Sequence, residues 1–160
     1  MIVDPDERRR VADLIDLHEG RLGVPLLDGE GIRRLLAETR RIAVIGASPD
    51  PFRPSNGVIR DLLVLGYEIV PVNPAAESVE GLTCYPDLAT AVAATGKVDI
   101  VDVFRRAEAC PPHAREAVAA GARCLWLQLG IASRAAGEIA AAGGLEVIMD
   151  RCLAVEARRL

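Results

Sequence analysis

The residues with the clearest chemical potential form a loop, Gly46 to Asn56, between an apolar run and a helical pattern. A loop in this position can turn backbone N–H groups and a helix N-terminus toward a phosphate. Gly46 allows the chain to turn without a Cβ, and Arg53 offers a charged fork for an anion. Ser48, Ser55 and Asn56 add side-chain donors. The loop therefore predicts a site for a phosphate-bearing ligand.

The same loop departs from a dinucleotide fingerprint, which has three glycines and an acidic residue at the end of the second strand. Here Gly46 stands alone among prolines, and the second apolar run ends at a neutral Asn73. These departures count against NAD and leave a phosphorylated adenine nucleotide open. A structural role also stays open, since Arg53 could pair on the surface with Asp50 or Asp61.

The other candidates for catalysis lack partners. His18 and His113 have no serine or cysteine at a recognisable spacing, so no nucleophile–base triad is expected. Asp99 and Asp102 are three residues apart on a predicted strand and point to opposite faces. We therefore predict no catalytic centre in this chain.

The cysteines are widely spaced, with no CxxC pair, and are predicted to be reduced thiols rather than zinc ligands: Cys84, Cys110, Cys124 and Cys152. We expect no metal site. Cys152 lies beside Arg151, which could lower its thiol pKa and allow a disulfide with a ligand thiol. Cys110 is a second thiol candidate. A quiet structural role is the alternative for both.

Five apolar runs set the positions of these residues. Their continuous apolar character is typical of parallel strands buried on both faces: Ile42 to Gly46, Glu68 to Asn73, Val98 to Phe104, Cys124 to Gly130 and Leu145 to Asp150. Helical patterns lie between them, at Asn56 to Leu65, Leu88 to Ala94, Pro111 to Ala120 and Ser133 to Ala142. This alternation predicts an α/β fold, a doubly wound parallel sheet with helices on both faces.

Two further helices are predicted ahead of the first strand, over Pro5 to His18 and Gly29 to Thr39. We divide the chain into a helical N-terminal extension, residues 1–39, and a Rossmann-like domain, residues 40–160.

Composition narrows the function classes. The chain has 160 residues, 51% of them hydrophobic, which suits one globular domain. Its net charge of −4 argues against a nucleic-acid partner. No apolar run approaches the roughly 18 residues of a membrane span, and the charged N-terminus does not resemble a secretory signal. We expect a cytoplasmic protein.

The motifs GASPDPFRPSNGV, IVPVNP, VEGLTCYPDL, VDIVDVFRRAE, WLQLGI and VIMDRC resemble those of the small CoA-binding domain proteins of bacteria and archaea. That family is similar to the CoA-binding N-terminal domain of succinyl-CoA synthetase α subunits. The resemblance spans about Arg40 to Leu160. After Cys152, the chain has Leu153 and Ala154 where the family pattern has proline and often a basic residue.

The resemblance implies a Rossmann-like fold with CoA lying across the strand ends. It implies that the first loop holds the pyrophosphate, through Gly46, Ala47, Ser48, Arg53, Pro54 and Ser55. It places Asn73, Pro74, Phe104 and Arg105 around the adenine and ribose. At the rim after the third apolar run, Arg105 is a candidate for the 3′-phosphate or for capping the next helix, and Arg106 is expected to be solvated. Phe104 could stack on adenine or be an ordinary core ring. Gln128 and Gly130 would lie toward the pantetheine.

We therefore expect a protein that binds coenzyme A or an acyl-CoA without chemistry of its own, as a sensor, carrier or regulatory module. The alternatives are an NAD(P)-binding oxidoreductase and an accessory subunit of an acyl-CoA synthetase. The sequence leaves open whether copies of the chain associate or a separate protein partner is needed.

Overall fold

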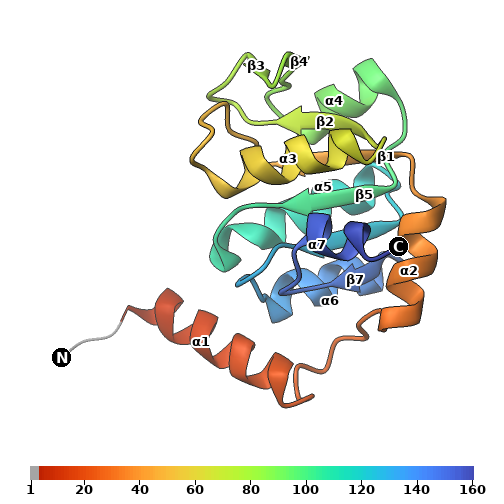
Figure 1. The fold of residues 1–160 in the computed structure, drawn as a ribbon. Coiled ribbons are helices and arrows are strands. Elements are labelled where there is room, and N and C mark those ends of the chain that lie inside the picture. The colour runs from red at the N-terminus through yellow and green to blue at the C-terminus, as the bar shows by residue number, and fades with distance from the viewer. Residues whose placement is uncertain (1–3) are drawn as a thin grey trace.

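A five-stranded parallel sheet forms the centre of the molecule, in the order β2-β1-β5-β6-β7 (Figure 1). The computed structural model describes residues 4–160. Each predicted apolar run matches one strand, β1 beginning one residue before its run: β1 (Arg41–Ile45), β2 (Glu68–Val72), β5 (Ile100–Val103), β6 (Cys124–Leu127) and β7 (Glu146–Ile148). All neighbouring strands pair in parallel. The predicted α/β fold with a doubly wound sheet is confirmed.

Both faces of the sheet are apolar, and each is covered by helices. One face packs against α4 (Leu88–Thr95), α5 (Cys110–Ala119) and α6 (Arg134–Ala142), whose inward residues include many alanines. The other packs against α2 (Gly29–Glu38), α3 (Pro54–Val64) and α7 (Leu153–Arg158). Small side chains let helices approach a sheet built from Val, Ile and Leu, so the core needs few aromatic rings.

Local signals account for several helix boundaries. Ser133 caps α6 as predicted, because its Oγ accepts a hydrogen bond from the backbone N–H of Ala136 at 3.1 Å. Helix α3 begins at Pro54, two residues earlier than predicted. Proline is favoured in a first helical turn, where its missing N–H costs nothing.

Three short elements were not predicted: the hairpin of β3 (Ser78–Val79) and β4 (Leu82–Thr83), the 3₁₀ turn η1 (Ala107–Ala109), and α7. Helix α7 buries Leu153, Ala154 and Ala157 against α2 and α3. All three depart from the family pattern, since Ala157 stands where a larger aromatic residue or His is expected. Here they make an apolar contact between α7 and its neighbours.

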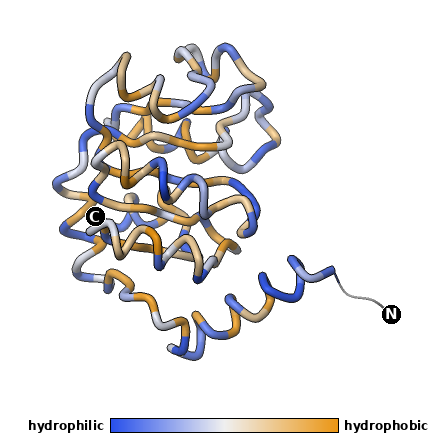
Figure 2. Tube along the Cα trace, turned by 180° about the vertical axis from the view of Figure 1, so that it is seen from behind, coloured by the Kyte–Doolittle hydropathy of each residue, from blue (hydrophilic) through white to orange (hydrophobic). Residues whose placement is uncertain are grey.

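Helix α1 (Pro5–His18) extends along one end of the fold (Figure 1). Figure 2 shows hydrophobic and hydrophilic residues alternating along it. Leu14 and Leu17 pack against the main core, whereas Val11 and Ile15 are about half exposed, at 51% and 48%. None of the helices within residues 4–160 is long and apolar enough to cross a membrane.

Candidate functional site

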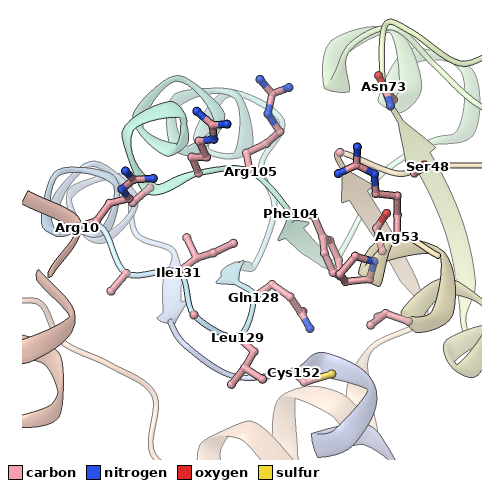
Figure 3. A pocket seen from close by; sticks show the side chains of 18 of the residues that line it. Arg10, Ser48, Arg53, Asn73, Phe104, Arg105, Gln128, Leu129, Ile131 and Cys152 are labelled. Atoms are coloured by element: carbon pink, nitrogen blue, oxygen red, sulfur yellow. The ribbon is translucent and has the colours of Figure 1, made fainter. Parts of the chain in front are cut away.

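A cavity of about 800 Å³ opens at the carboxyl ends of the parallel strands (Figure 3). Strand order reverses between β1 and β5, since β2 lies on one side of this pair and β6 and β7 on the other. Ligands of open α/β sheets bind at such a switch point. All predicted binding residues except Ala47 and Pro74 line the cavity: Gly46, Ser48, Arg53, Pro54, Ser55, Asn73, Phe104, Arg105, Gln128 and Gly130.

Gly46 ends β1 in a conformation that few other residues adopt. Its φ is +83°, and its N–H donates to the Val72 carbonyl at 3.0 Å. A Cβ at this position would lie 2.7 Å from the carbonyl oxygen of Phe104. The β1 loop and the end of β5 therefore approach each other as closely as they do because residue 46 has no side chain.

Asn56 fixes the loop instead of facing a ligand, so its predicted role as a donor to phosphate is wrong. The side chain is fully buried. Its Nδ2 donates to the Ser48 carbonyl at 3.0 Å and to Glu80 Oε1 at 2.9 Å. Ser48 Oγ in turn accepts from the Asp50 N–H at 3.1 Å.

The N-terminus of α3 faces the cavity through Arg53, Pro54 and Ser55. Its first turn holds no acidic residue, and no side chain caps it. Pro54 has no N–H, and the Arg53 N–H donates to the Asp50 carbonyl at 3.0 Å. The Ser55 N–H and the positive end of the helix dipole remain to favour an anion.

Arg53 pairs with neither acid proposed as its surface partner. Asp61 Oδ2 accepts from Arg158 Nη1 at 2.7 Å, and Asp50 Oδ1 accepts from the Phe52 N–H at 2.9 Å. The alternative of a surface ion pair for Arg53 is therefore wrong. The exposed guanidinium is left at the cavity edge.

Asn73 stands at the end of β2, where a carboxylate would mark an NAD site. Its Nδ2 donates to the Ala47 carbonyl at 2.7 Å, and its Oδ1 accepts from the Ala75 N–H at 2.9 Å. Asn73 thus ties the two loops together while bordering the cavity. Ala47 is buried beneath it, and Pro74 is exposed outside the cavity.

The other half of the cavity follows β5 and β6. Phe104 is half-buried and Arg105 exposed. Gln128 is 6% exposed, and its Oε1 accepts a long hydrogen bond from the Leu153 N–H at 3.4 Å. The N–H of Gly130 donates to Asp150 Oδ1 at 2.7 Å, which holds the loop after β6 against the end of β7.

Several lining residues were not predicted. Arg106, expected to be solvated, borders the cavity, as do Arg10 and Leu14 of α1. The remaining residues are Val58, Ala107, Leu129, Ile131, Ala132 and Cys152. The sequence predicts α1 itself, but no local pattern indicates where it docks.

The cysteines differ in accessibility, and all four are free thiols. Cys110 is fully buried, and this burial, with Glu108 nearby, raises its pKa to about 12. Its Sγ donates to the Arg106 carbonyl at 3.4 Å. Cys110 as a second reactive thiol is therefore wrong, because its thiolate is unfavourable. Cys152 alone among the cysteines borders the cavity, half-buried.

Asp99 and Asp102 occupy different surroundings, as predicted. Asp99 Oδ2 accepts from the N–H groups of Arg40 and Arg41 at 2.9 and 3.0 Å. Asp102 is fully buried, neither of its oxygens has a hydrogen-bond partner among the described residues, and burial raises its pKa well above the ordinary range. The two carboxyl groups do not form a shared acid–base site.

The charged side chains that line the cavity are all positive. Four arginines line it, Arg10, Arg53, Arg105 and Arg106, and no Asp or Glu does so within residues 4–160. Arg53, Arg105 and Arg106 form no ion pair in that part of the chain, whereas Arg10 has a loose one with Glu108, at 3.6 Å. Such a cavity suits a ligand with several negative charges.

Comparison with known proteins agrees with this geometry. Residues 40–158 match the model of a family described as "CoA binding domain". The chain is 37% identical over 124 residues to the uncharacterized protein YneT of Bacillus subtilis, covering 78% of this chain and 90% of that protein.

Two solved structures share both fold and sequence. A hypothetical protein from Pyrococcus horikoshii is 36% identical, with a TM-score of 0.78 over 84% of this chain and 92% of that one. A Thermus thermophilus protein is also 36% identical, with a TM-score of 0.76 over 82% of this chain and 98% of that one. The strand-end cavity, the resemblance of its motifs and these matches agree: the chain belongs to the CoA-binding domain family.

Proposed function

We propose that this protein binds coenzyme A or an acyl-CoA in the strand-end cavity. The observation that carries the proposal is the pair Arg53 and Arg105, which line the cavity beside the N-terminus of α3, form no ion pair among the described residues and have no carboxylate in the lining. CoA presents a diphosphate and a 3′-phosphate, and charge-assisted hydrogen bonds from arginine suit both.

The layout of the cavity supports one orientation of the ligand. In Rossmann-like sheets the pyrophosphate lies at the first helix N-terminus and the adenosine near the end of the second strand. Here these positions are α3 and Asn73. The rest of the ligand then crosses β5 and β6, where Leu129 and Ile131 offer apolar contact to pantetheine.

We further propose that binding occurs without chemistry on the ligand, as in a sensor, carrier or regulatory module. In support, no histidine lines the cavity within the described residues, and Cys152 has no base beside it in the lining. Incubating the protein with acetyl-CoA and titrating released thiol tests this. Release faster than in buffer would contradict the non-catalytic role while leaving binding intact.

Calorimetric titration of ligand-free protein, under reducing conditions, tests binding with CoA, dephospho-CoA and NAD. CoA should bind most tightly, dephospho-CoA more weakly, and NAD not measurably. Binding of NAD in the absence of CoA binding would overturn the proposal in favour of an NAD-dependent oxidoreductase.

Arg105→Gln provides the residue-level test. Losing a charged hydrogen bond to phosphate should weaken CoA binding about 10- to 100-fold. Arg115→Gln is the matched control, because Arg115 is an exposed arginine of α5 outside the cavity lining. Equal CoA affinities in the two variants would show that Arg105 does not contact the ligand.

A further inference from the structure

Helix α1 borders the cavity at the end farthest from the loop Gly46 to Ser55, which we call the phosphate loop. Figure 3 shows Arg10 beyond Ile131, on the side away from Ser48, Arg53 and Asn73. Leu14, one turn further along α1, also lines the cavity. We call this part of the cavity, formed by Arg10, Leu14, Ile131 and Ala132, the α1 end. It lies partly outside the segment that matches the family, residues 40–158.

Ion pairs and hydrogen bonds fix α1 in this position. The Arg134 N–H donates to Asp13 Oδ2 at 3.0 Å, and its guanidinium donates to Asp16 Oδ2 at 2.5 Å and to the Leu22 carbonyl. Asp13 is only 8% exposed. His18 Nε2 lies 2.9 Å from Asp150 Oδ2. Arg10 is one turn before Asp13 and Leu14, so these contacts set where its side chain can reach.

The orientation proposed for CoA determines which part of a ligand reaches the α1 end. With adenosine near Asn73 and the diphosphate at α3, pantetheine runs over β5 and β6 toward Ile131. Its thiol, or the acyl group of a thioester, then points at Leu14 and Arg10. The lining changes there from apolar side chains to a guanidinium.

The charged side chains that line the cavity at and beside the α1 end suit an anion. Arg10 and Arg106 both line the cavity. Glu108 lies 3.6 Å from Arg10 Nη1 and does not line it. The charged side chains that face the cavity here are therefore both positive. The Arg10 guanidinium has only this loose contact with Glu108, and 34% of the side chain is accessible.

We propose that the α1 end selects acyl-CoA thioesters whose acyl chain ends in a free carboxylate, and that Arg10 is the specificity-determining residue. Arginine suits this task because its planar fork can donate two parallel hydrogen bonds to a carboxylate. The inference rests on the proposed binding of CoA and names the class of thioester that the same cavity prefers.

The test compares pairs of thioesters with equal chain length by calorimetry on the full chain: malonyl-CoA with propionyl-CoA, and glutaryl-CoA with valeryl-CoA. At least one carboxylated member should bind about 10-fold more tightly than its neutral partner, the gain expected from one charge-assisted contact. Equal affinity within both pairs would overturn the inference. Failure of CoA and of all four thioesters to bind would overturn the proposed function itself.

Variants assign the preference to Arg10. Arg10→Gln should abolish it while changing the affinity for CoA less than about 2-fold, and Arg10→Lys should keep part of it. Arg9→Gln is the control, because Arg9 is 68% exposed, pairs with Asp6 and does not line the cavity. Helicity and melting of each variant show whether α1 remains folded. An equal loss of affinity for CoA and every thioester in Arg10→Gln would overturn the inference, because Arg10 would then contact CoA itself.

Discussion

The phosphate loop, Gly46 to Ser55, and the α1 end border the same cavity but are built in different ways. The phosphate loop is positioned by backbone geometry: the turn at Gly46, the N-terminus of α3 and the buried amide of Asn56. The α1 end is positioned by side-chain contacts between distant segments, chiefly those of Arg134 with Asp13 and Asp16.

This difference predicts that the two ends can be altered separately. A loop held by backbone packing cannot move without disturbing the sheet beneath it. A helix held by ion pairs and a few apolar contacts can loosen while the sheet stays intact. Such a division would let the phosphate loop keep a common ligand, while the α1 end decides which acyl groups are accepted.

Gly46→Ala should have the largest effect. The new Cβ would meet the Phe104 carbonyl at 2.7 Å on a residue whose φ is +83°. Backbone strain and overpacking together should lower the free energy of unfolding by about 3 kcal/mol or more. CoA affinity should also fall, because relieving the clash moves the loop that faces the ligand. Urea unfolding and calorimetry measure the two effects.

Gly57→Ala is the matched control for this change. Gly57 lies within α3 without a positive φ, and a Cβ there would meet nothing nearer than Arg60 Nη2 at 3.9 Å. Alanine should stabilise the helix by up to about 1 kcal/mol. If both variants lose stability to the same degree, the close approach at Gly46 is not what positions the loop.

Asp102→Asn tests the sheet on which the phosphate loop rests. Asp102 is buried in β5, two residues before Phe104. Burial raises the native pKa of Asp102 above its unfolded value. Its contribution to stability is therefore fully present below the unfolded pKa and is lost as the pH rises toward the native pKa. The slope is about 1.4 kcal/mol per pH unit in that window.

The asparagine variant cannot titrate at this position, so it should gain stability relative to the natural protein as the pH rises from about 4. Urea unfolding at several pH values measures the difference between the two proteins. Because Asp102 is out of reach of solvent, added salt should leave that difference nearly unchanged. Parallel stability curves for the two proteins would show that Asp102 ionises in the folded state as readily as in the unfolded one.

The contrast between local backbone geometry and contacts of distant segments also explains which elements the sequence could predict. Continuous apolar runs indicated every strand of the main sheet, because parallel strands covered on both faces need such runs. Helix α7 was missed because six residues are too few to show a helical period. The hairpin of β3 and β4 was missed for a similar reason, since each strand has two residues.

The cavity-lining residues that the sequence predicted differ from those it missed in the same way. Those fixed by local geometry, such as Gly46 and Ser55, were found because a strand, a turn and a helix start succeed one another in the sequence. Arg10 was missed because its position depends on contacts across more than a hundred residues, such as that of Asp13 with Arg134. For Asn56 the residue was noted but its role was wrong, since only the fold shows that Glu80 reaches its amide.

Arg134→Ala should loosen the α1 end. It leaves the nearly buried Asp13 without a guanidinium and removes the bonds to Asp16 and Leu22. The side chain is 34% exposed, so the expected loss is about 1–2 kcal/mol, below that for a fully buried pair. Amide exchange in α1 should speed up, and any preference for carboxylated thioesters should weaken while CoA still binds.

Arg21→Ala is the control for this loosening, since Arg21 also pairs with Asp16 but is 60% exposed. It should change stability by less than about 0.5 kcal/mol. A loss of CoA affinity in Arg134→Ala as large as in Gly46→Ala would break the distinction between the two ends, because it would make α1 part of the structure that holds the phosphate loop.

His18→Ala should have the smallest effect. His18 is 67% exposed where it meets Asp150, and exposed pairs contribute about 0.2–1 kcal/mol. Asp150 keeps its hydrogen bond from the Gly130 N–H through its other oxygen, so the loop after β6 should stay in place. Amide exchange should therefore increase at the C-terminal end of α1 and remain unchanged at Gly130. Increased exchange at Gly130 would mean that His18 orients Asp150, so that α1 supports the β6 loop as well as closing the cavity beside it.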